Sequence, residues 1–184
     1  MENTPREEIK RIVEAQRKFF RSGRTLDIRF RKESLRALKR AMEKWEKPLA
    51  DALWQDLHKS YEEAYLTELS IVLGEIRNHI SHLSKWAAPK RVCTPLKMFP
   101  SRSKVVQEPL GCSLIMAPWN YPVQLLLNPL VGAISAGCTA VLKPSPYVPH
   151  VSKVLEEMIR ETFAPEYIAV VQGNREVNTA LLEE

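Results

Sequence analysis

Residues 111–145 read GCSLIMAPWNYPVQLLLNPLVGAISAGCTAVLKPS, and the order of patterns in this stretch decides the fold. Short apolar runs at 112–118 and 139–144 are bounded by Gly or Pro, which is typical of buried strands. Between them, residues 123–137 read as a helix that ends at Gly137, a residue type favoured just past a helix C-terminus. This order predicts two parallel strands joined by a right-handed crossover.

The same alternation continues to the end of the sequence. Residues 149–163 read as a second helix, residues 167–173 as a third strand and residues 174–184 as the start of a third helix. Three parallel strands with their helices make half of a doubly wound, Rossmann-like sheet. We therefore expect an α/β fold that is truncated after this half, as in a fragment of a longer protein, with an unpaired sheet edge.

The sequence before this stretch divides into two parts. Residues 1–88 carry apolar residues at helical spacing, and the motif SYEE at 60–63 is a capping box that opens a long helix. Residues 89–109 are punctuated by four prolines, and within them 103–108 alternates as an edge strand would. We expect an N-terminal helical region, a proline-rich connector with an edge strand, and the βαβαβα unit at 110–184.

Composition and charge exclude some classes of protein. Hydrophobic residues make up 45% and charged residues 27% of the chain, and no apolar run approaches the ~20 residues needed to cross a bilayer. Residues 1–48 hold 15 basic and 8 acidic residues, a net charge of +7 against −2 for the remainder. Because acids are interleaved with the bases at helical spacing, this charge favours a solvated helical face over a nucleic-acid site. We expect no membrane segment in this region.

The cysteines and histidines indicate neither a disulfide nor a metal site. Cys93, Cys112 and Cys138 are odd in number, widely spaced and outside any C-x-x-C motif, which indicates a reducing compartment and leads us to expect a cytoplasmic protein. Cys112 and Cys138 lie in apolar segments and are expected to be buried thiols. His79 and His82 lack clustered carboxylates, so we expect no metal.

Polar side chains at the strand ends are the candidate functional residues, because ligands of open parallel sheets bind at the carboxyl ends of strands. Asn120 follows the first strand, and either Asn120 or Tyr121 could cap the next helix. Alternatively, the Asn120 amide points into a cleft and stabilises a developing oxyanion. Lys143 ends the second strand, either as an exposed lysine or as a donor to a ribose or a 2′-phosphate.

The motif pair PWNYP at 118–122 and AGCTAVLKPS at 136–145 resembles the aldehyde dehydrogenase superfamily. The segments at 19–43, 49–60 and 128–137 resemble its class 3 branch, which acts on fatty or aromatic aldehydes. The resemblance covers essentially all 184 residues. It implies an oxidoreductase that converts aldehydes to carboxylic acids with NAD+ or NADP+ through a cysteine thiohemiacetal and thioester, and that forms a homodimer.

The resemblance also implies roles for individual residues. Asn120 matches the side-chain donor to the oxyanion, and Tyr121 and Gln124 match positions that line the aldehyde tunnel. The residues implied for cofactor binding are the end of the first strand and the second strand-end motif: Met116, Ala117, Pro118, Trp119, Lys143 and Ser145. It further implies that 1–88 packs on the nucleotide-binding domain, that the connector at 89–109 carries an oligomerisation strand, and that 110–184 is the first half of the NAD(P)-binding domain, with the catalytic domain absent.

This sequence departs from the family pattern at one position and lacks several of its motifs. The family usually has Glu three residues after the lysine, where this chain has Pro146, so we expect NADP+ to be accepted at least as well as NAD+. The glycine-rich phosphate turn, the general-base Glu and the nucleophilic Cys are expected after residue 184. We therefore expect the fragment alone to be inactive.

Two other functions remain open from the residues themselves. The chain could be a degenerate, stand-alone module that binds a partner protein through its open sheet edge and basic helices. It could also be a basic helical domain that binds nucleic acid, which would show a strong dependence on salt.

Overall fold

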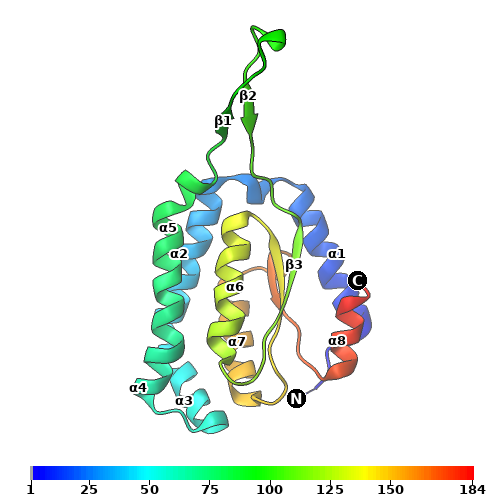
Figure 1. Ribbon diagram of the computed structural model, residues 1–184. Helices are drawn as coiled ribbons and strands as arrows, with labels where there is room; N and C mark the ends of the chain where they lie inside the picture. The colour runs from blue at the N-terminus through cyan, green and yellow to red at the C-terminus, as the bar shows by residue number, and fades with distance from the viewer. Residues whose placement is uncertain (1) are drawn as a thin grey trace.

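The computed structural model describes residues 2–184 as one helical and sheet body with a projecting arm (Figure 1). The N-terminal half is helical, as predicted, and a capping hydrogen bond from the Glu63 N–H to Ser60 Oγ opens the fourth helix. The helices are α1 Arg6–Arg21, α2 Ile28–Lys44, α3 Glu46–Leu57, α4 Tyr61–Ala64, a π-helical turn Tyr65–Leu69, α5 Ser70–Trp86, α6 Pro122–Ala136, α7 Pro149–Thr162 and α8 Arg175–Leu182, with short 3-10 turns at Arg24–Leu26 and Leu96–Met98.

The sheet of the body has three parallel strands in the order β3-β4-β5. They are β3 Cys112–Met116, β4 Thr139–Lys143 and β5 Ile168–Val170, joined by α6 and α7. The prediction of a parallel βαβαβα unit is thus confirmed. In the register of β3 and β4, Met116 pairs with Lys143, so both strands end at the same edge of the sheet.

Helices cover both faces of this sheet. Helices α6 and α7 contact one face and are in turn covered by α2, α3 and α5, whereas α1 and α8 lie together on the other face (Figure 1). Alternate residues of β4 serve the two sides: Ala140 and Leu142 belong to the larger apolar core, and Val141 belongs to the smaller core beneath α1 and α8. All five residues of β4 are buried, as expected of a central parallel strand.

The first strand is less buried than its sequence predicts. Within residues 2–184 only β4 pairs with β3, and both Cys112 and Met116 at its ends are exposed. The expectation of a buried Cys112 thiol is therefore wrong, since an edge strand leaves its ends open to solvent, whereas Cys138 is buried as expected.

The connector forms an antiparallel hairpin that projects from the body (Figure 1). Its strands are β1 Lys90–Val92 and β2 Ser103–Val105, so the strand predicted in 103–108 exists but is shorter and pairs within the connector. Leu96 and Phe99 in its loop are 93% and 84% exposed. The hairpin therefore presents apolar side chains that the rest of the described chain does not cover.

Candidate functional site

The candidate site lies where β3 and β4 end. The Ala117 N–H donates to the Lys143 carbonyl at 3.1 Å, which extends the pairing one residue beyond β3. Two connections leave the sheet here: the Asn120 bend (residues 117–122) leads into α6, and the Lys143 turn (residues 143–148) leads into α7. The sequence predicted this juxtaposition from the strand ends alone.

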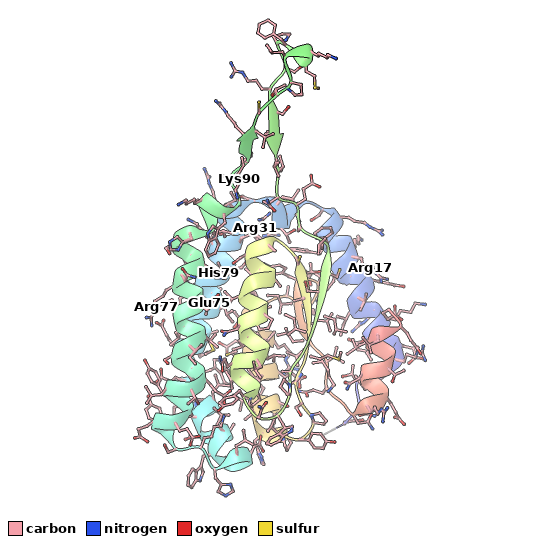
Figure 2. The ribbon with its side chains drawn as sticks, in the orientation of Figure 1. Arg17, Arg31, Glu75, Arg77, His79 and Lys90 are labelled. Atoms are coloured by element: carbon pink, nitrogen blue, oxygen red, sulfur yellow. The ribbon has the colours of Figure 1, made fainter. Side chains whose placement is uncertain are left out.

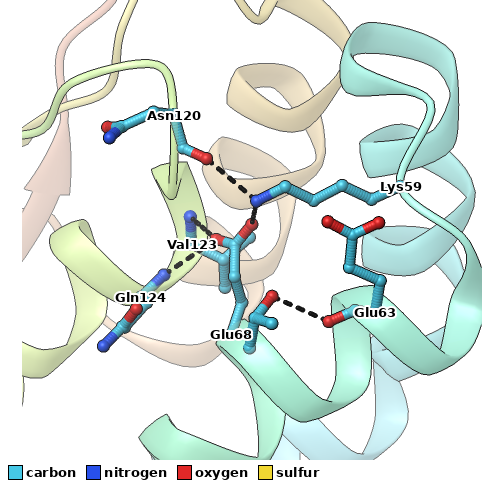
Figure 3. A network of polar contacts seen from close by, with 7 residues as sticks. Lys59, Glu63, Glu68, Asn120, Val123 and Gln124 are labelled. Carbon is cyan, nitrogen blue, oxygen red and sulfur yellow. Dashed lines mark hydrogen bonds and ion pairs between the residues drawn. The ribbon is translucent and has the colours of Figure 1, made fainter.

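The start of α6 is capped by a residue that the sequence did not suggest. Neither Asn120 nor Tyr121 makes a side-chain cap, so that interpretation is wrong. Instead Glu68 Oε2 accepts hydrogen bonds from the Val123 and Gln124 N–H groups at 2.8 and 3.2 Å (Figure 3). Because an acceptor from another element satisfies these helix-end donors, the Asn120 side chain is free of the capping role.

Lys59 completes the contacts beneath the bend. Its Nζ lies 2.7 Å from Glu68 Oε1 and donates to the Asn120 carbonyl at 2.9 Å (Figure 3). The same ammonium lies 4.1 Å from the centroid of the Tyr121 ring, a cation–π distance. The Glu68 side chain is fully buried and that of Lys59 is 10% exposed.

Glu68 reaches the bend from a helical irregularity. It lies in the π-helical turn Tyr65–Leu69, between α4 and α5. Such turns are rare and occur frequently at functional sites. The apolar spacing of this segment predicts one continuous α-helix and does not reveal the wider π-helical turn. The sequence therefore predicted the helix but did not identify Glu68 as a residue of the site.

The side chain of Asn120 is exposed at the surface of the bend. Among residues 2–184 it has no hydrogen-bond partner, and Figure 3 shows it directed away from Lys59. Its backbone is fixed while its amide remains available. An amide with this arrangement can donate a hydrogen bond to an oxygen that becomes negatively charged, and it carries no titrating proton.

Lys143 is buried, not exposed as one interpretation of the sequence had it. The residue is 2% exposed, and its Nζ donates to the Pro144 carbonyl at 2.8 Å. Burial lowers the pKa of the Lys143 ammonium from its ordinary value. Its other N–H groups have no acceptor among residues 2–184, which leaves donors for a ligand oxygen.

The other residues singled out from the sequence lie on the same two connections. Ser145 is buried, and its Oγ accepts from the Tyr147 N–H at 3.3 Å, so this hydroxyl shapes the Lys143 turn. On the Asn120 bend and at its ends, Ala117 is buried, Gln124 is half-buried, and four residues are exposed: Met116, Pro118, Trp119 and Tyr121.

Two further observations concern other kinds of site. In the described residues 2–184 no group of three metal-ligating side chains occurs, and His79 contacts Glu75 and Ser135 at 2.9 and 2.6 Å (Figure 2). No helix among those residues has both the length and the apolar character to cross a membrane.

Comparison with known proteins decides the family. The profile of the aldehyde dehydrogenase family matches residues 1–184. This chain belongs to the aldehyde dehydrogenase family. The Asn120 bend and the Lys143 turn both lie within the matched residues.

Individual relatives match almost the whole of this chain and are themselves much longer. It is 44% identical over 164 residues to the 4,4'-diaponeurosporen-aldehyde dehydrogenase of Staphylococcus aureus, covering 89% of this chain and 36% of the relative. It is 37% identical over 176 residues to the dimeric NADP-preferring aldehyde dehydrogenase of the dog, covering 96% of this chain and 39% of the relative. Other relatives are named as members of aldehyde dehydrogenase family 3. The chain thus spans little more than a third of the curated relatives.

A solved structure agrees with the fold of this aldehyde dehydrogenase chain. The substrate-bound state of Staphylococcus aureus AldH superposes with a TM-score of 0.93 at 42% identity, covering 96% of this chain and 38% of that one. The match includes the helical region and the parallel sheet, so both belong to one family architecture.

Proposed function

We propose that this chain supplies the oxyanion donor and part of the cofactor site of an enzyme that oxidises aldehydes to carboxylic acids with NAD+ or NADP+. The observation that carries the proposal is the Asn120 amide. It is exposed, without a partner among the described residues, and stands on a bend at the carboxyl edge of a parallel sheet. A structural asparagine at a helix start would instead bond the helix N–H groups, which Glu68 already serves.

The chemistry follows from charge development at the aldehyde. When a nucleophile adds to the carbonyl carbon, the oxygen becomes an oxyanion, and a fixed N–H donor lowers the free energy of that state. The Asn120 amide has such a donor and stays neutral at every working pH. Loss of one donor of this kind typically lowers kcat on the order of 10²–10³-fold.

The nucleophile itself is proposed to lie outside these 184 residues, which cover little more than a third of the relatives. Cys112 opens β3 and Cys138 directly precedes β4, so both lie at the amino edge of the sheet. Strands of this length separate the two edges by about 13 Å, at roughly 3.3 Å per residue. Cys93 lies in the connector. None of the three is placed to attack a carbonyl held by Asn120, so the chain alone is expected to be inactive.

The Lys143 turn fits a dinucleotide. A buried ammonium with unused donors suits ribose hydroxyls or a 2′-phosphate, and Ser145 shapes the turn beside it. Exposed Met116, Pro118 and Trp119, with buried Ala117, offer a largely apolar surface along the strand end. When bound, the nicotinamide accepts hydride from the substrate. Pro146 leaves no carboxylate to repel a 2′-phosphate, and the name of the dog relative supports acceptance of NADP+.

Tyr121 and Gln124 are proposed to line the approach of the aldehyde. Tyr121 is partly exposed beside Asn120, and Gln124 is half-buried in the first turn of α6. Both therefore lie within one helical turn of the proposed oxyanion donor.

Assembly and location are also proposals. The chain divides into helices at 1–88 that pack on the nucleotide-binding half-domain at 110–184, and the connector at 89–109, whose exposed Leu96 and Phe99 suit an interface with a second copy. The dog relative is named as dimeric, which supports a homodimer. Three free cysteines fit the reducing cytoplasm. Nothing in the arrangement favours the interaction module or the nucleic-acid binder.

The test uses a completed enzyme, in which this chain replaces the matching N-terminal part of the 44% identical staphylococcal relative. We expect NAD(P)+-dependent oxidation of an aldehyde by this chimera, and a loss on the order of 10²–10³ in kcat for Asn120→Ala, with little change in KM. The control is Asn78→Ala, whose residue lies on the exposed surface of α5. If Asn120→Ala retained full kcat in an active chimera, the oxyanion role would be refuted.

A further inference from the structure

We propose that the buried Lys59–Glu68 ion pair is a positioning device for catalysis, which holds the Asn120 amide at the place where the oxyanion forms. This inference rests on the function proposed for Asn120. Neither Lys59 nor Glu68 is suggested to touch the substrate. Both act through the backbone of the Asn120 bend.

The contacts of the pair are divided over the two sides of Pro122. On the helix side, Glu68 Oε2 accepts from the N–H groups of Val123 and Gln124 at 2.8 and 3.2 Å. On the bend side, Lys59 Nζ donates to the Asn120 carbonyl at 2.9 Å and lies 4.1 Å from the Tyr121 ring. The 2.7 Å contact between Lys59 and Glu68 joins the two attachments into one unit (Figure 3).

The donors and acceptors of the pair are almost entirely used on this bend. One oxygen of Glu68 takes the lysine and the other takes two helix-end N–H groups. The Lys59 ammonium has three donors, of which one goes to Glu68, one goes to Asn120, and the remaining charge faces the aromatic ring. The Asn120 side chain receives none of these contacts, so its backbone is fixed while its amide stays free.

Burial makes a purely stabilising role a poor explanation. The Glu68 side chain is fully buried and Lys59 nearly so. Replacing such a pair by apolar residues is often neutral or stabilising, because desolvation of the charges offsets their attraction. A buried pair is better explained where geometry must be specified, and here it is directed at the one bend that carries the proposed donor.

The π-helical turn also supports a positioning role for the ion pair. A regular helix would continue from α4 into α5 without the irregularity at Tyr65–Leu69, and the turn carries the carboxylate that reaches α6. Such turns occur frequently at functional sites. Donor placement is also demanding, since an error of 1 Å can cost on the order of 10²-fold in rate.

The experiment measures kcat and KM in the completed enzyme for Glu68→Gln and Lys59→Met. We expect each variant to lower kcat roughly tenfold or more, with KM for the aldehyde changed much less, because misplacement of the donor affects the transition state above all. Lys59→Arg, which keeps the charge, should recover part of kcat. The matched control is Lys47→Met, which breaks an exposed pair with Asp51 in α3 and should leave kcat unchanged.

A double-variant cycle tells positioning from general weakening of the fold. If Glu68 acts through Asn120, adding Glu68→Gln to Asn120→Ala should lower kcat by less than twofold beyond Asn120→Ala alone, since effects through one group do not multiply. If Asn120→Ala lowers kcat but Glu68→Gln multiplies that loss in full, or has no effect alone, this inference is overturned and the proposed function stands. If Asn120→Ala is itself silent, both fall.

If a chimera variant fails to assemble, the positioning role can be tested on the 184-residue chain by hydrogen exchange and NMR. Amide hydrogen exchange of Val123 and Gln124 should accelerate at least tenfold in Glu68→Gln, and the NMR signals of the Asn120 side-chain amide should shift in both variants. Lys47→Met should change neither. Unaltered exchange together with unaltered Asn120 signals would overturn the positioning role.

Discussion

Helices α6 and α7 begin in closely similar ways at the same edge of the sheet, yet they are held differently. Each starts with proline at its first position, Pro122 or Pro149, after a residue that makes no side-chain cap. Each is capped instead by a carboxylate from elsewhere: Glu68 caps α6, and Asp56 caps α7 by accepting from the Val151 N–H at 2.9 Å. Both helices begin with proline and lack a local side-chain cap, so both depend on an acceptor from a distant part of the sequence.

The difference lies in what accompanies each carboxylate. Asp56 pairs with His150, which is largely exposed, and among residues 2–184 it makes no hydrogen bond to the turn before the helix. Glu68 pairs with a buried lysine that also bonds the residue on the far side of the proline. A capping acid is enough to start a helix. The additional lysine at α6 agrees with the proposal that the preceding bend, which carries Asn120, has to be held in one position.

The largest expected effect is a loss of stability when the ion pair at the start of α6 is broken. Lys59→Met leaves the Glu68 carboxylate buried without its cation and should lower the free energy of unfolding by about 3–5 kcal/mol. Urea unfolding of the 184-residue chain measures it, with Lys47→Met as the exposed control. A loss below about 1 kcal/mol, the size usual for exposed pairs, would show that the two helix starts do not differ in this way.

A smaller loss is expected at the start of α7. Asp56→Ala removes a cap without stranding a buried charge, so the free energy of unfolding should fall by about 1 kcal/mol, within the range of 0.5–2 found for caps. Asp56→Asn keeps an acceptor for the Val151 N–H and should recover most of it. An Asp56→Ala loss equal to that of Lys59→Met would remove the contrast.

Cofactor choice tests the turn before α7. Pro146→Glu in the completed enzyme places a carboxylate three residues after Lys143, where it should repel a 2′-phosphate by ~1 kcal/mol. The ratio of kcat/KM for NADP+ to that for NAD+ should therefore fall roughly fivefold. The control is Glu156→Gln on α7, which should leave this ratio unchanged. If Pro146→Glu also left it unchanged, the proposal that the Lys143 turn binds the cofactor would be contradicted.

The smallest expected effect is a change of the free energy of unfolding with pH. Burial lowers the pKa of Lys143, so below that pKa the ammonium is charged in both the folded and the unfolded chain, and the folded chain carries the whole desolvation penalty. As pH rises through the lowered pKa towards the ordinary value of ~10.4, the unfolded chain holds more protons than the folded chain and the free energy of unfolding rises.

Lys143→Met should remove this rise, while Lys153→Met at an exposed position of α7 should keep it. Unfolding in urea over that pH window measures the difference between each variant and the parent chain. Parallel curves for the parent and Lys143→Met would contradict the burial argument.

Much of this arrangement follows from the sequence, because each strand and helix is marked by local periodicity and by Gly or Pro at its ends. The carboxyl ends of parallel strands share an edge, so the pattern also placed the segments that carry Asn120 and Lys143 at the same edge of the sheet. What it could not show is the set of contacts beneath them. Lys59 lies 61 residues from Asn120, and Glu68 lies 55 residues from Val123. No local spacing rule reports pairings over such separations.

Burial at the sheet edges was also beyond local pattern. An apolar run resembles a central strand whether or not a second neighbour pairs with it, so Cys112 was expected to be buried and is exposed. Conversely Lys143, which ends a fully buried strand, is itself enclosed. Which strand lies at an edge is a property of the assembled sheet.

The projecting hairpin has a practical consequence. In a single copy of the chain, a protease that cuts between Leu96 and Phe99 severs an exposed loop without opening the core. The pieces on either side still share extensive packing, with α1 against β4 and α5 against α6. A nicked preparation of the 184-residue chain should therefore elute as one particle on size exclusion and separate only in denaturant.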